Sequence, residues 1–256
     1  MTTRINFFPV LAAVLLLFLG FSQAWADSAS LSAPQEDRIR EIVADTLRQK
    51  PELVLEALKT LEERQKAAEE ARIQEQLSVN EKSLFQHPDD PVGGNPNGDV
   101  TLVEFFDYRC PYCKQVHPDV MTLLKEDGNI RFVYKEFPIL GPQSDMAAQA
   151  ALASQVLEKY QQFSDALMTA RGSFSPDHIF AIAEKTGMDV KALQRAMEAS
   201  KDKNDKIIRR NLELAARLNI TGTPAFVIGG QVIRGAVDLE TLKLLVSEAR
   251  AKKKES

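Results

Sequence analysis

The feature that most restricts the folds open to this chain is a pair of apolar stretches, residues 100–108 and 130–137, separated by one helical stretch. The first stretch, VTLVEFFDY, is apolar on both alternating faces, which is typical of a strand buried in the middle of a sheet. We expect residues 111–126 between them to form a helix. Strands joined through a helix run parallel, so the sequence predicts a βαβ unit and an α/β fold.

The chain then enters a long helical stretch, residues 142–218, before it returns to the sheet. Residues 225–228 and 231–234 are short strands, and Gly229-Gly230 between them predicts a hairpin. Asp238 opens a final helix. The pattern therefore predicts an α/β core that is split by a helical insert. Residues suited to start helices within the insert are Ser144, Ser175, Asp189 and Asp202.

The first 26 residues have the pattern of a secretory signal peptide. Arg4 precedes an apolar stretch, residues 7–21, and Ala24-Trp25-Ala26 is a small-x-small cleavage site. The alternative is an uncleaved membrane anchor, but the apolar stretch is short for a spanning helix, which needs roughly 20 residues. We therefore expect the mature protein to be soluble in an oxidising compartment, the periplasm.

An N-terminal helical arm precedes the α/β core. Residues 34–49 and 51–77 are expected to be helices, and residues 87–99, rich in Pro, Gly, Asn and Asp, mark the start of the main domain. The heptad signal in the arm is weak, since it is apolar only at its start. Helices this apolar must cover that face, so we expect a homodimer or homotrimer. The side chains to be covered are Ile39, Ile42, Val43, Val54, Leu58 and Leu61.

The chemistry lies at Cys110-Pro111-Tyr112-Cys113, where the first strand gives way to the helix. Free N–H groups and the positive end of the helix dipole stabilise a thiolate at Cys110. Pro111 favours the first helical turn, and Cys113 lies one turn inside, where it is shielded and placed to close a disulfide. This pair can exchange disulfides with another protein.

Other uses of two cysteines fit less well. A structural disulfide across so short a loop removes little chain entropy. Cys113 and His117 form half of a zinc site, but His87 and His178 lie in unrelated segments, and we expect His117 to be a surface residue. Copper(I) held by two thiolates is the stronger metal alternative. With 36 acidic against 32 basic residues, the chain is a poor candidate for binding nucleic acid.

Glu104 is an unexpected carboxylate in a strand that should be buried. Burial without a partner should raise its pKa, which would suit a proton acceptor for Cys113 when a mixed disulfide resolves. The alternative is a salt bridge with Lys135 on the next strand.

Three motifs resemble the DsbA-like branch of the thioredoxin superfamily. They are LVEFFDYRCPYCKQVHP at 102–118, YKEFPILG at 134–141 and TGTPAFV at 221–227. The resemblance implies that Pro224 is the cis-proline of the fold and that the backbone of Thr223 pairs with a substrate strand. Pro111 and Tyr112 would then face the substrate, with Tyr112 tuning the redox potential. The arm is similar to the N-terminal extensions of oligomeric exported members, the ScsC-like proteins.

The resemblance implies a thioredoxin fold with an inserted helical domain, preceded by an N-terminal helical oligomerisation arm. The expected divisions are a signal peptide at 1–26, the arm at 27–87, the thioredoxin-fold domain at 88–141 and 219–256, and the helical insertion at 142–218.

The expected function is thiol–disulfide oxidoreduction in cysteine-containing secreted proteins, by isomerisation, oxidation or both. The enzyme would need no cofactor beyond the Cys110–Cys113 disulfide, and a membrane oxidase or reductase would reset that pair. Two alternatives remain, a copper(I)-binding protein that uses the same thiols and a scaffold whose redox site is vestigial. The intact CPYC and Thr223-Pro224 argue against the scaffold.

Cleavage after Ala26 would remove Trp25, the only tryptophan of the chain. When the protein is exported by its own signal peptide, its intact mass should therefore correspond to a chain that begins at Asp27. The mature protein should also show no tryptophan fluorescence. A secreted species that retains Trp25 would show that the cleavage site is assigned wrongly.

Overall fold

The computed structural model describes residues 31–255, so the predicted signal peptide, residues 1–26, lies outside the described residues. The chain divides into two compact units, Met1–Lys66 and Ala67–Ser256, which are described separately. Within the described part, none of the helices combines the length and apolar character needed to cross a membrane.

The described part of the first unit is helical. It holds α2 (Ala33–Gln49) and the start of α3 (Glu52–Val79), which confirms both helices predicted for the arm. The side chain of Gln35 and that of Ser32 form a capping box at the start of α2. The apolar side chains of these helices remain exposed; they are Ile39, Ile42, Val43, Leu47, Leu53, Val54, Leu55, Leu58 and Leu61.

The second unit is built on a five-stranded sheet with the order β1-β3-β2-β4-β5. The strands β2 (Val100–Phe106) and β3 (Ile130–Glu136) run parallel, which confirms the predicted βαβ unit. The strands β4 (Ala225–Ile228) and β5 (Gln231–Arg234) form the predicted antiparallel hairpin. β2 lies at the centre, so its C-terminal end opens into the middle of the domain.

The edge strand β1 (Val92–Gly94) was not predicted, because it lies in a stretch rich in turn-forming residues. It pairs antiparallel with β3. Gly94 has a φ of +63°, and a Cβ there would lie 2.4 Å from the carbonyl oxygen of Ile130. Position 94 therefore requires glycine because β3 approaches so closely, although glycine in a sequence is more often a sign of a loop.

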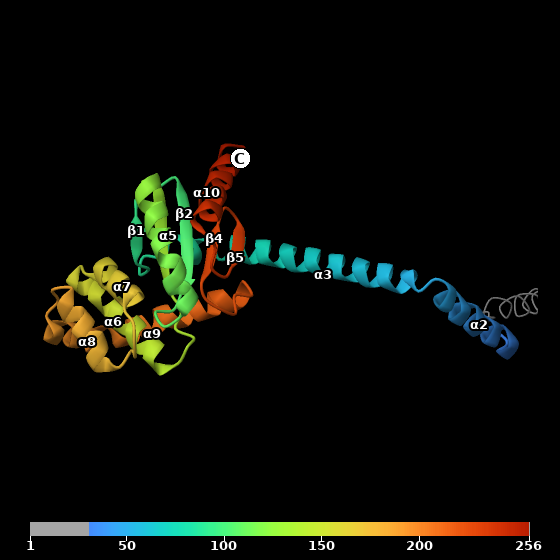
Figure 1. Cartoon of the computed structure of the whole chain (residues 1–256), viewed down its shortest axis with the longest axis horizontal. Helices are drawn as coiled ribbons and strands as arrows, with labels where there is room; N and C mark the ends of the chain where they lie inside the picture. The colour runs from blue at the N-terminus through green and yellow to red at the C-terminus, as the bar shows by residue number, and fades with distance from the viewer. Residues whose placement is uncertain (1–30, 256) are drawn as a thin grey trace, which may run out of the picture. The chain divides into compact units, whose positions relative to one another are not determined.

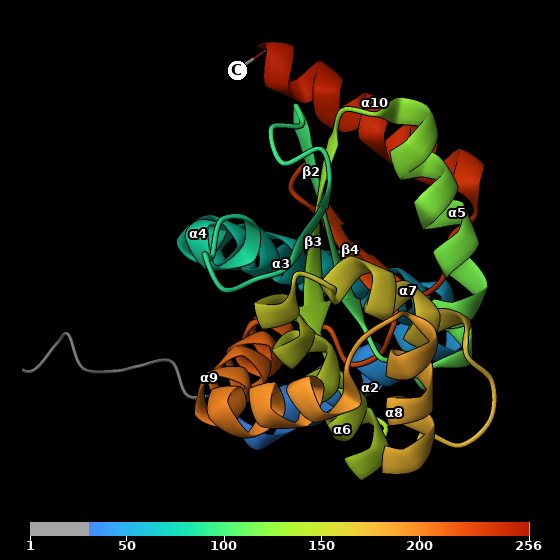
Figure 2. The same ribbon diagram turned by 90° about the vertical axis from the view of Figure 1, so that its left-hand side faces the viewer.

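Helices cover both faces of the sheet (Figures 1 and 2). On one face lie α5 (Pro111–Asp127) and α10 (Leu239–Glu255). On the other face lie the C-terminal part of α3, α4 (Glu81–Phe85) and the C-terminal end of α9 (Val190–Arg217). These layers are those of a thioredoxin fold, and they place the start of α5 at the C-terminal end of the central strand.

The insert consists of α6 (Pro142–Ala153), the 3-10 turn Ser154–Leu157, α7 (Tyr160–Thr169), α8 (Pro176–Lys185) and α9. The side chains of Ser175 and Asp189 accept backbone N–H groups and cap α8 and α9 as predicted. Two predicted starts are wrong. Gly141 is the N-cap of α6, so Ser144 lies within that helix, and Asp202 lies inside α9 because no Gly or Pro interrupts residues 190–217.

The sheet-bearing unit begins earlier than the expected residue 88. Ile73 and Leu77, one helical turn apart on α3, are buried in the core cluster that also contains Leu84. The guanidinium of Arg72 donates to the backbone oxygen of Arg217 at 3.0 Å. The end of α3 is therefore part of the folded domain rather than of a free arm.

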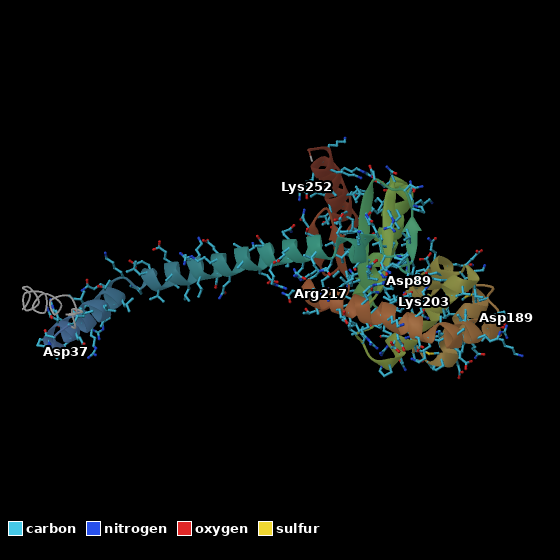
Figure 3. The ribbon with its side chains drawn as sticks, turned by 180° about the vertical axis from the view of Figure 1, so that it is seen from behind. Asp37, Asp89, Asp189, Lys203, Arg217 and Lys252 are labelled. Atoms are coloured by element: carbon cyan, nitrogen blue, oxygen red, sulfur yellow. The ribbon has the colours of Figure 1, made fainter. Side chains whose placement is uncertain are left out.

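A buried ion cluster fastens the segment before β1 to the sheet. The ammonium of Lys135 is fully buried, bonds to the carboxylate of Asp90 and donates to the backbone oxygen of Ser83 at 2.6 Å. The guanidinium of Arg210 on α9 binds the same carboxylate. Nearby, Lys203 pairs with Asp89 at 2.8 Å at the surface (Figure 3).

Replacing Asp90 with Asn should lower the free energy of unfolding by about 3–5 kcal/mol, because the Lys135 ammonium would stay buried without its counter-charge. Urea denaturation measures this loss. The control is Asp205→Asn, which breaks the partly exposed pair with Lys201 at 2.6 Å and should cost less than about 1 kcal/mol. Equal losses in the two variants would contradict the special weight of the buried pair.

Candidate active site

The redox segment, defined as residues 107–118, joins the end of β2 to the first turns of α5. Cys110 is the N-cap of α5, and Pro111 is its first residue. The carboxylate of Asp107 accepts the backbone N–H of Arg109 at 2.8 Å and that of Leu140 at 3.0 Å. One side chain thus holds the loop that carries Cys110 and the neighbouring loop after β3.

The structure brings the predicted proline loop to this segment. The Thr223-Pro224 peptide is cis, and the Cys110 thiol donates to the backbone oxygen of Thr223 at 3.2 Å. Residues 113 positions apart in the sequence therefore meet at one sulfur atom. Tyr112 is 61% exposed beside it, while Pro224 is buried.

The two cysteines, both free thiols here, lie in opposite electrostatic situations. A hydrogen bond from the Cys113 thiol lowers the pKa of Cys110 to about 5, helped by the Thr223 side chain and by backbone N–H groups at the helix start. The bond to the Cys110 sulfur, with burial and the nearby Glu104, raises the pKa of Cys113 far above its ordinary value. Near neutral pH, Cys110 is therefore a thiolate and Cys113 a protonated thiol.

The two cysteines differ less in solvent exposure than in pKa. Cys110 is 4% exposed, whereas Cys113 is completely buried. Cys110 keeps this small exposure and lies beside Thr223, so the geometry suits Cys110 for attack on an external disulfide and Cys113 for closing the internal one.

Glu104 lies beneath this pair on β2, 4% exposed. Burial, followed by the Cys110 thiolate, raises the pKa of Glu104 to about 8. The alternative salt bridge with Lys135 is wrong. Glu104 is in register with Tyr134, so Lys135, the next residue of β3, points to the opposite face and binds Asp90 there.

His117 is buried, at 8% exposure, and the prediction of a surface residue is wrong. Its Nε2 lies 3.5 Å from the carboxylate of Asp165 on α7, and burial, followed by the charge of Lys114, lowers the pKa of His117 to about 4. No local pattern shows that α7 lies against this face of α5, because the contact joins residues 48 positions apart. Within residues 31–255 there is no cluster of three His, Cys, Asp or Glu side chains suited to a metal ion.

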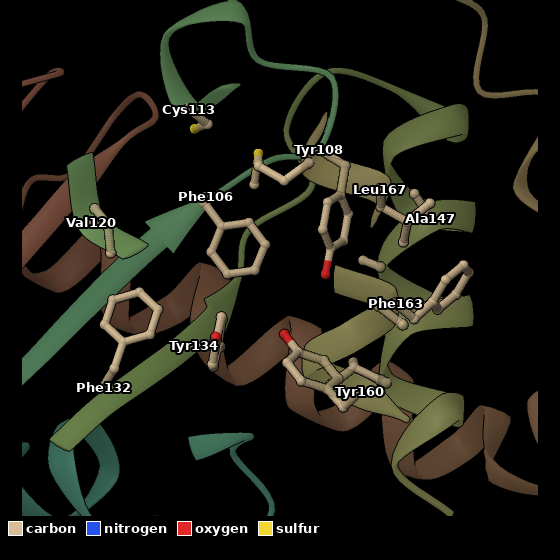
Figure 4. Close-up of a cluster of buried hydrophobic side chains, with 14 of the residues drawn as sticks. Phe106, Tyr108, Cys113, Val120, Phe132, Tyr134, Ala147, Tyr160, Phe163 and Leu167 are labelled. Atoms are coloured by element: carbon tan, nitrogen blue, oxygen red, sulfur yellow. The ribbon is translucent and has the colours of Figure 1, made fainter. Parts of the chain in front are cut away.

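A buried network beside the redox segment was missed by sequence reasoning. The Tyr108 hydroxyl lies 2.7 Å from the carboxylate of Glu136 and 2.9 Å from the hydroxyl of Ser164. The Tyr160 hydroxyl donates to the same Glu136 oxygen at 2.7 Å, and Figure 4 shows both tyrosines turned toward this region. Burial raises the pKa of Glu136 to about 8. The network ties the loop before Cys110 to β3 and to the insert.

A thioredoxin fold with a stabilised thiolate at the start of α5 and a cis-proline loop beside it defines a thiol–disulfide oxidoreductase. Residues 86–248 match the family described as thioredoxin, so the chain belongs to the thioredoxin family. Residues 35–68 match the family described as the N-terminal domain of copper resistance protein ScsC.

Solved structures agree with this class. A thioredoxin-like oxidoreductase from Silicibacter pomeroyi is 44% identical, with 67% of this chain and 98% of that chain covered and a TM-score of 0.65. The thiol-disulfide exchange protein α-DsbA2 from Wolbachia pipientis is 33% identical, covering 71% and 97%, with a TM-score of 0.67. A linker-deletion variant of Proteus mirabilis ScsC is 28% identical and covers 88% and 99%, with a TM-score of 0.64.

Curated relatives include a much longer protein. An Na⁺/H⁺ antiporter NhaA of Salinispora arenicola is 32% identical over 165 residues, which are 63% of this chain. The chain spans about a quarter of that protein's length, 25%. The likeness therefore concerns one part of the antiporter chain and transfers no transport activity.

Iodoacetamide should label Cys110 with a rate that rises through pH 5 and is level by pH 7, because the alkylated species is the thiolate. Mass spectrometry of the peptide from residues 110–114 gives the site and the rate. Cys110→Ser should leave Cys113 almost unlabelled across this range. Faster labelling of Cys113, or a rate that keeps rising to pH 9, would contradict the assignment.

Glu104→Gln should slow the release of a mixed disulfide at Cys110 by about a hundredfold at pH 7, because Cys113 loses its proton acceptor. In the unsubstituted protein, release should speed up as the pH rises toward 8, where Glu104 becomes ionised, and the variant should lose this rise. Quenched-flow release of a labelled peptide measures both.

The matched control is Glu136→Gln, because Glu136 is also buried and its pKa is also raised to about 8. That variant should keep the rise in release rate with pH. If the release rate stopped depending on pH in Glu136→Gln and kept its pH dependence in Glu104→Gln, the proton acceptor would be Glu136 and the assignment to Glu104 would be wrong.

Proposed function

We propose that this oxidoreductase is an exported, oligomeric enzyme that rearranges disulfides in cysteine-containing secreted proteins, with Cys110 as the attacking thiolate. The observation that carries the proposal is the position of Cys110 at the start of α5, where the Cys113 thiol and the backbone N–H groups of Tyr112 and Cys113 lower the pKa of Cys110. A thiolate stabilised there is reactive at neutral pH and is also a good leaving group.

Isomerisation needs no net change in electrons. The Cys110 thiolate attacks a substrate disulfide, forms a mixed disulfide and releases one substrate thiolate. A different substrate thiolate then attacks the substrate sulfur of the mixed disulfide, which forms the new pairing and frees Cys110. If the rearrangement stalls, Cys113 gives its proton to Glu104 and displaces the substrate, which leaves the Cys110–Cys113 disulfide.

Oxidation runs the last step in reverse. A substrate thiolate attacks Cys110 of the disulfide, and Cys113 leaves as it takes a proton from the side of Glu104. A second substrate thiolate then attacks the substrate sulfur of the mixed disulfide, which forms the substrate disulfide and releases Cys110 as a thiolate. Oxidation of a substrate leaves the cysteine pair reduced, so a membrane oxidase must restore the disulfide. A stalled isomerisation leaves the pair oxidised, so a membrane reductase must restore the thiols. No cofactor other than the Cys110–Cys113 pair takes part in these steps.

Substrate would be held by backbone contacts. The Thr223 backbone lies at the sulfur of Cys110, where an extended substrate segment can add alongside it with little sequence preference. Pro111 and the exposed Tyr112 would form the other side of the approach. These contacts suit an enzyme that accepts many unfolded secreted proteins.

The arm supports an oligomer and, through it, isomerisation. Its large apolar side chains from Ile39 to Leu61 are exposed in the single chain, and residues 35–68 match the ScsC N-terminal domain. Two or three chains joined through these helices would present several redox pairs to one substrate, which raises the effective concentration of thiolate for reshuffling. The predicted signal peptide would deliver the enzyme to the periplasm, where such substrates fold.

Copper(I) binding through Cys110 and Cys113 is the second candidate, favoured by the copper-resistance description of the matched N-terminal family. Anaerobic titration with Cu(I), run beside reduction of insulin, separates the two functions. Tight binding of stoichiometric Cu(I) with no insulin reduction would favour copper handling.

Deleting residues 27–66 should give a folded monomer that loses isomerase activity but keeps simple dithiol oxidation. The deletion ends at Lys66 because Ile73 and Leu77 belong to the domain core. Light scattering and recovery of scrambled ribonuclease measure the two properties.

In the full-length chain, Leu58→Glu should weaken the assembly, whereas Lys59→Glu, also exposed on α3, should leave it intact. A monomeric full-length protein would contradict the oligomer. Equal ribonuclease recovery by the truncated and full-length forms would contradict the link between the arm and isomerisation.

A further inference from the structure

Side chains from the redox segment converge on one short helix of the insert, α7. Tyr108 bonds to Ser164, and His117 lies 3.5 Å from Asp165. A third side chain, Lys114, reaches the end of the same helix. The insert therefore contacts the redox segment before, immediately after and one turn beyond the cysteine pair.

Of these three side chains, Lys114 makes the largest number of hydrogen bonds to the insert. Its Nζ donates to the backbone oxygens of Leu167, Met168 and Ala170 at 3.0, 2.9 and 2.9 Å, and lies 4.9 Å from the ring centre of Phe174. The last carbonyls of a helix lack partners within it and carry the negative end of its dipole. The aromatic face adds a further attraction for a cation. The ammonium is thus fixed rather than free in solvent.

Lys114 directly follows Cys113 in the sequence, so its ammonium group is attached close to the cysteine pair. Burial lowers the pKa of Lys114 to about 8, whereas the negative charges of Asp107 and of the Cys110 thiolate act to raise it. His117 on the same helix feels the Lys114 charge in turn, and Asp165 on α7 lies behind His117. The charge of the Cys110 thiolate is among those that act on Lys114, so the two charges interact in a partly desolvated place, where charges interact strongly.

We propose that Lys114 is a positioning residue for disulfide exchange: anchored on α7, it holds a fixed positive charge beside the cysteine pair and favours its reduced form. The inference rests on the proposed role of Cys110. When two glutathione molecules reduce the disulfide, Cys113 takes one proton, one proton is released and Cys110 is left as a thiolate. The reduced form carries one more negative charge than the disulfide, so a nearby cation stabilises it selectively.

Lys114→Gln tests the charge, because an amide can still donate to the carbonyls of α7. The equilibrium constant for reduction by glutathione should fall about three- to tenfold, a shift of at most about 30 mV toward a more reducing pair. The thiolate absorbance at 240 nm should also titrate at higher pH. Lys114→Arg, which keeps the charge, and Lys125→Gln, which removes an exposed charge from the same helix, should stay within about twofold.

An unchanged equilibrium constant and thiolate titration in Lys114→Gln, alongside a lower melting temperature, would reduce Lys114 to a structural tether and overturn the proposal. An equal change in the equilibrium constant in Lys125→Gln would overturn the proposal as well, because an exposed charge far along the helix would then stabilise the reduced pair as much as Lys114 does.

A second measurement needs no substitution at Lys114. Coupling is reciprocal, so oxidising the pair in the unsubstituted protein must make the Lys114 ammonium easier to deprotonate. NMR of the lysine side chains in both redox states should show this shift at Lys114, and its absence would overturn the proposal. If no thiolate titrates below pH 7, or if one persists in Cys110→Ser, the assignment of Cys110 fails instead, which separates the two claims.

Discussion

The hydrogen bond from the Cys113 thiol to the Cys110 sulfur is the interaction on which the site depends. It lowers the pKa of one cysteine and raises that of the other, so a symmetric pair of residues becomes an attacking thiolate and a protonated resolving thiol. The bond requires a helix to begin at Cys110, because only then does Cys113 lie one turn away on the buried side. It requires the central strand β2 to deliver the segment to the middle of the domain.

Around this bond, each layer of the fold has a distinct role. The loop at Thr223 supplies a polar contact to Cys110 and, in the proposed function, an edge for a substrate segment. The strand beneath places Glu104, a carboxyl with a raised pKa, next to the buried sulfur. The insert fastens the redox segment from the side, through the Tyr108 network and through Lys114. Chemistry therefore resides in the thioredoxin-fold part, while its precise electrostatics draw on the insert.

Local patterns were enough to predict the parts of this arrangement that arise from local sequence. The βαβ unit, the hairpin at Gly229-Gly230 and the helix start at Cys110 depend on apolar alternation and on Gly and Pro chemistry, which are visible in short windows. Apart from the two misplaced helix starts at Ser144 and Asp202, what was wrong or missed depends on distant contacts. His117 is buried because α7 covers it, and β1 forms because β3 approaches Gly94. Lys135 pairs with Asp90 because strand alternation turns it away from Glu104.

Equilibration of the purified protein in glutathione buffers of defined potential tests the stabilised thiolate most directly. A Cys110 pKa of about 5 lies between those of thioredoxin and DsbA, about 7 and about 3.5. We therefore expect the Cys110–Cys113 pair to have a potential between about −270 and about −120 mV. A potential at or below about −270 mV, or a pair that does not exchange with glutathione, would contradict it.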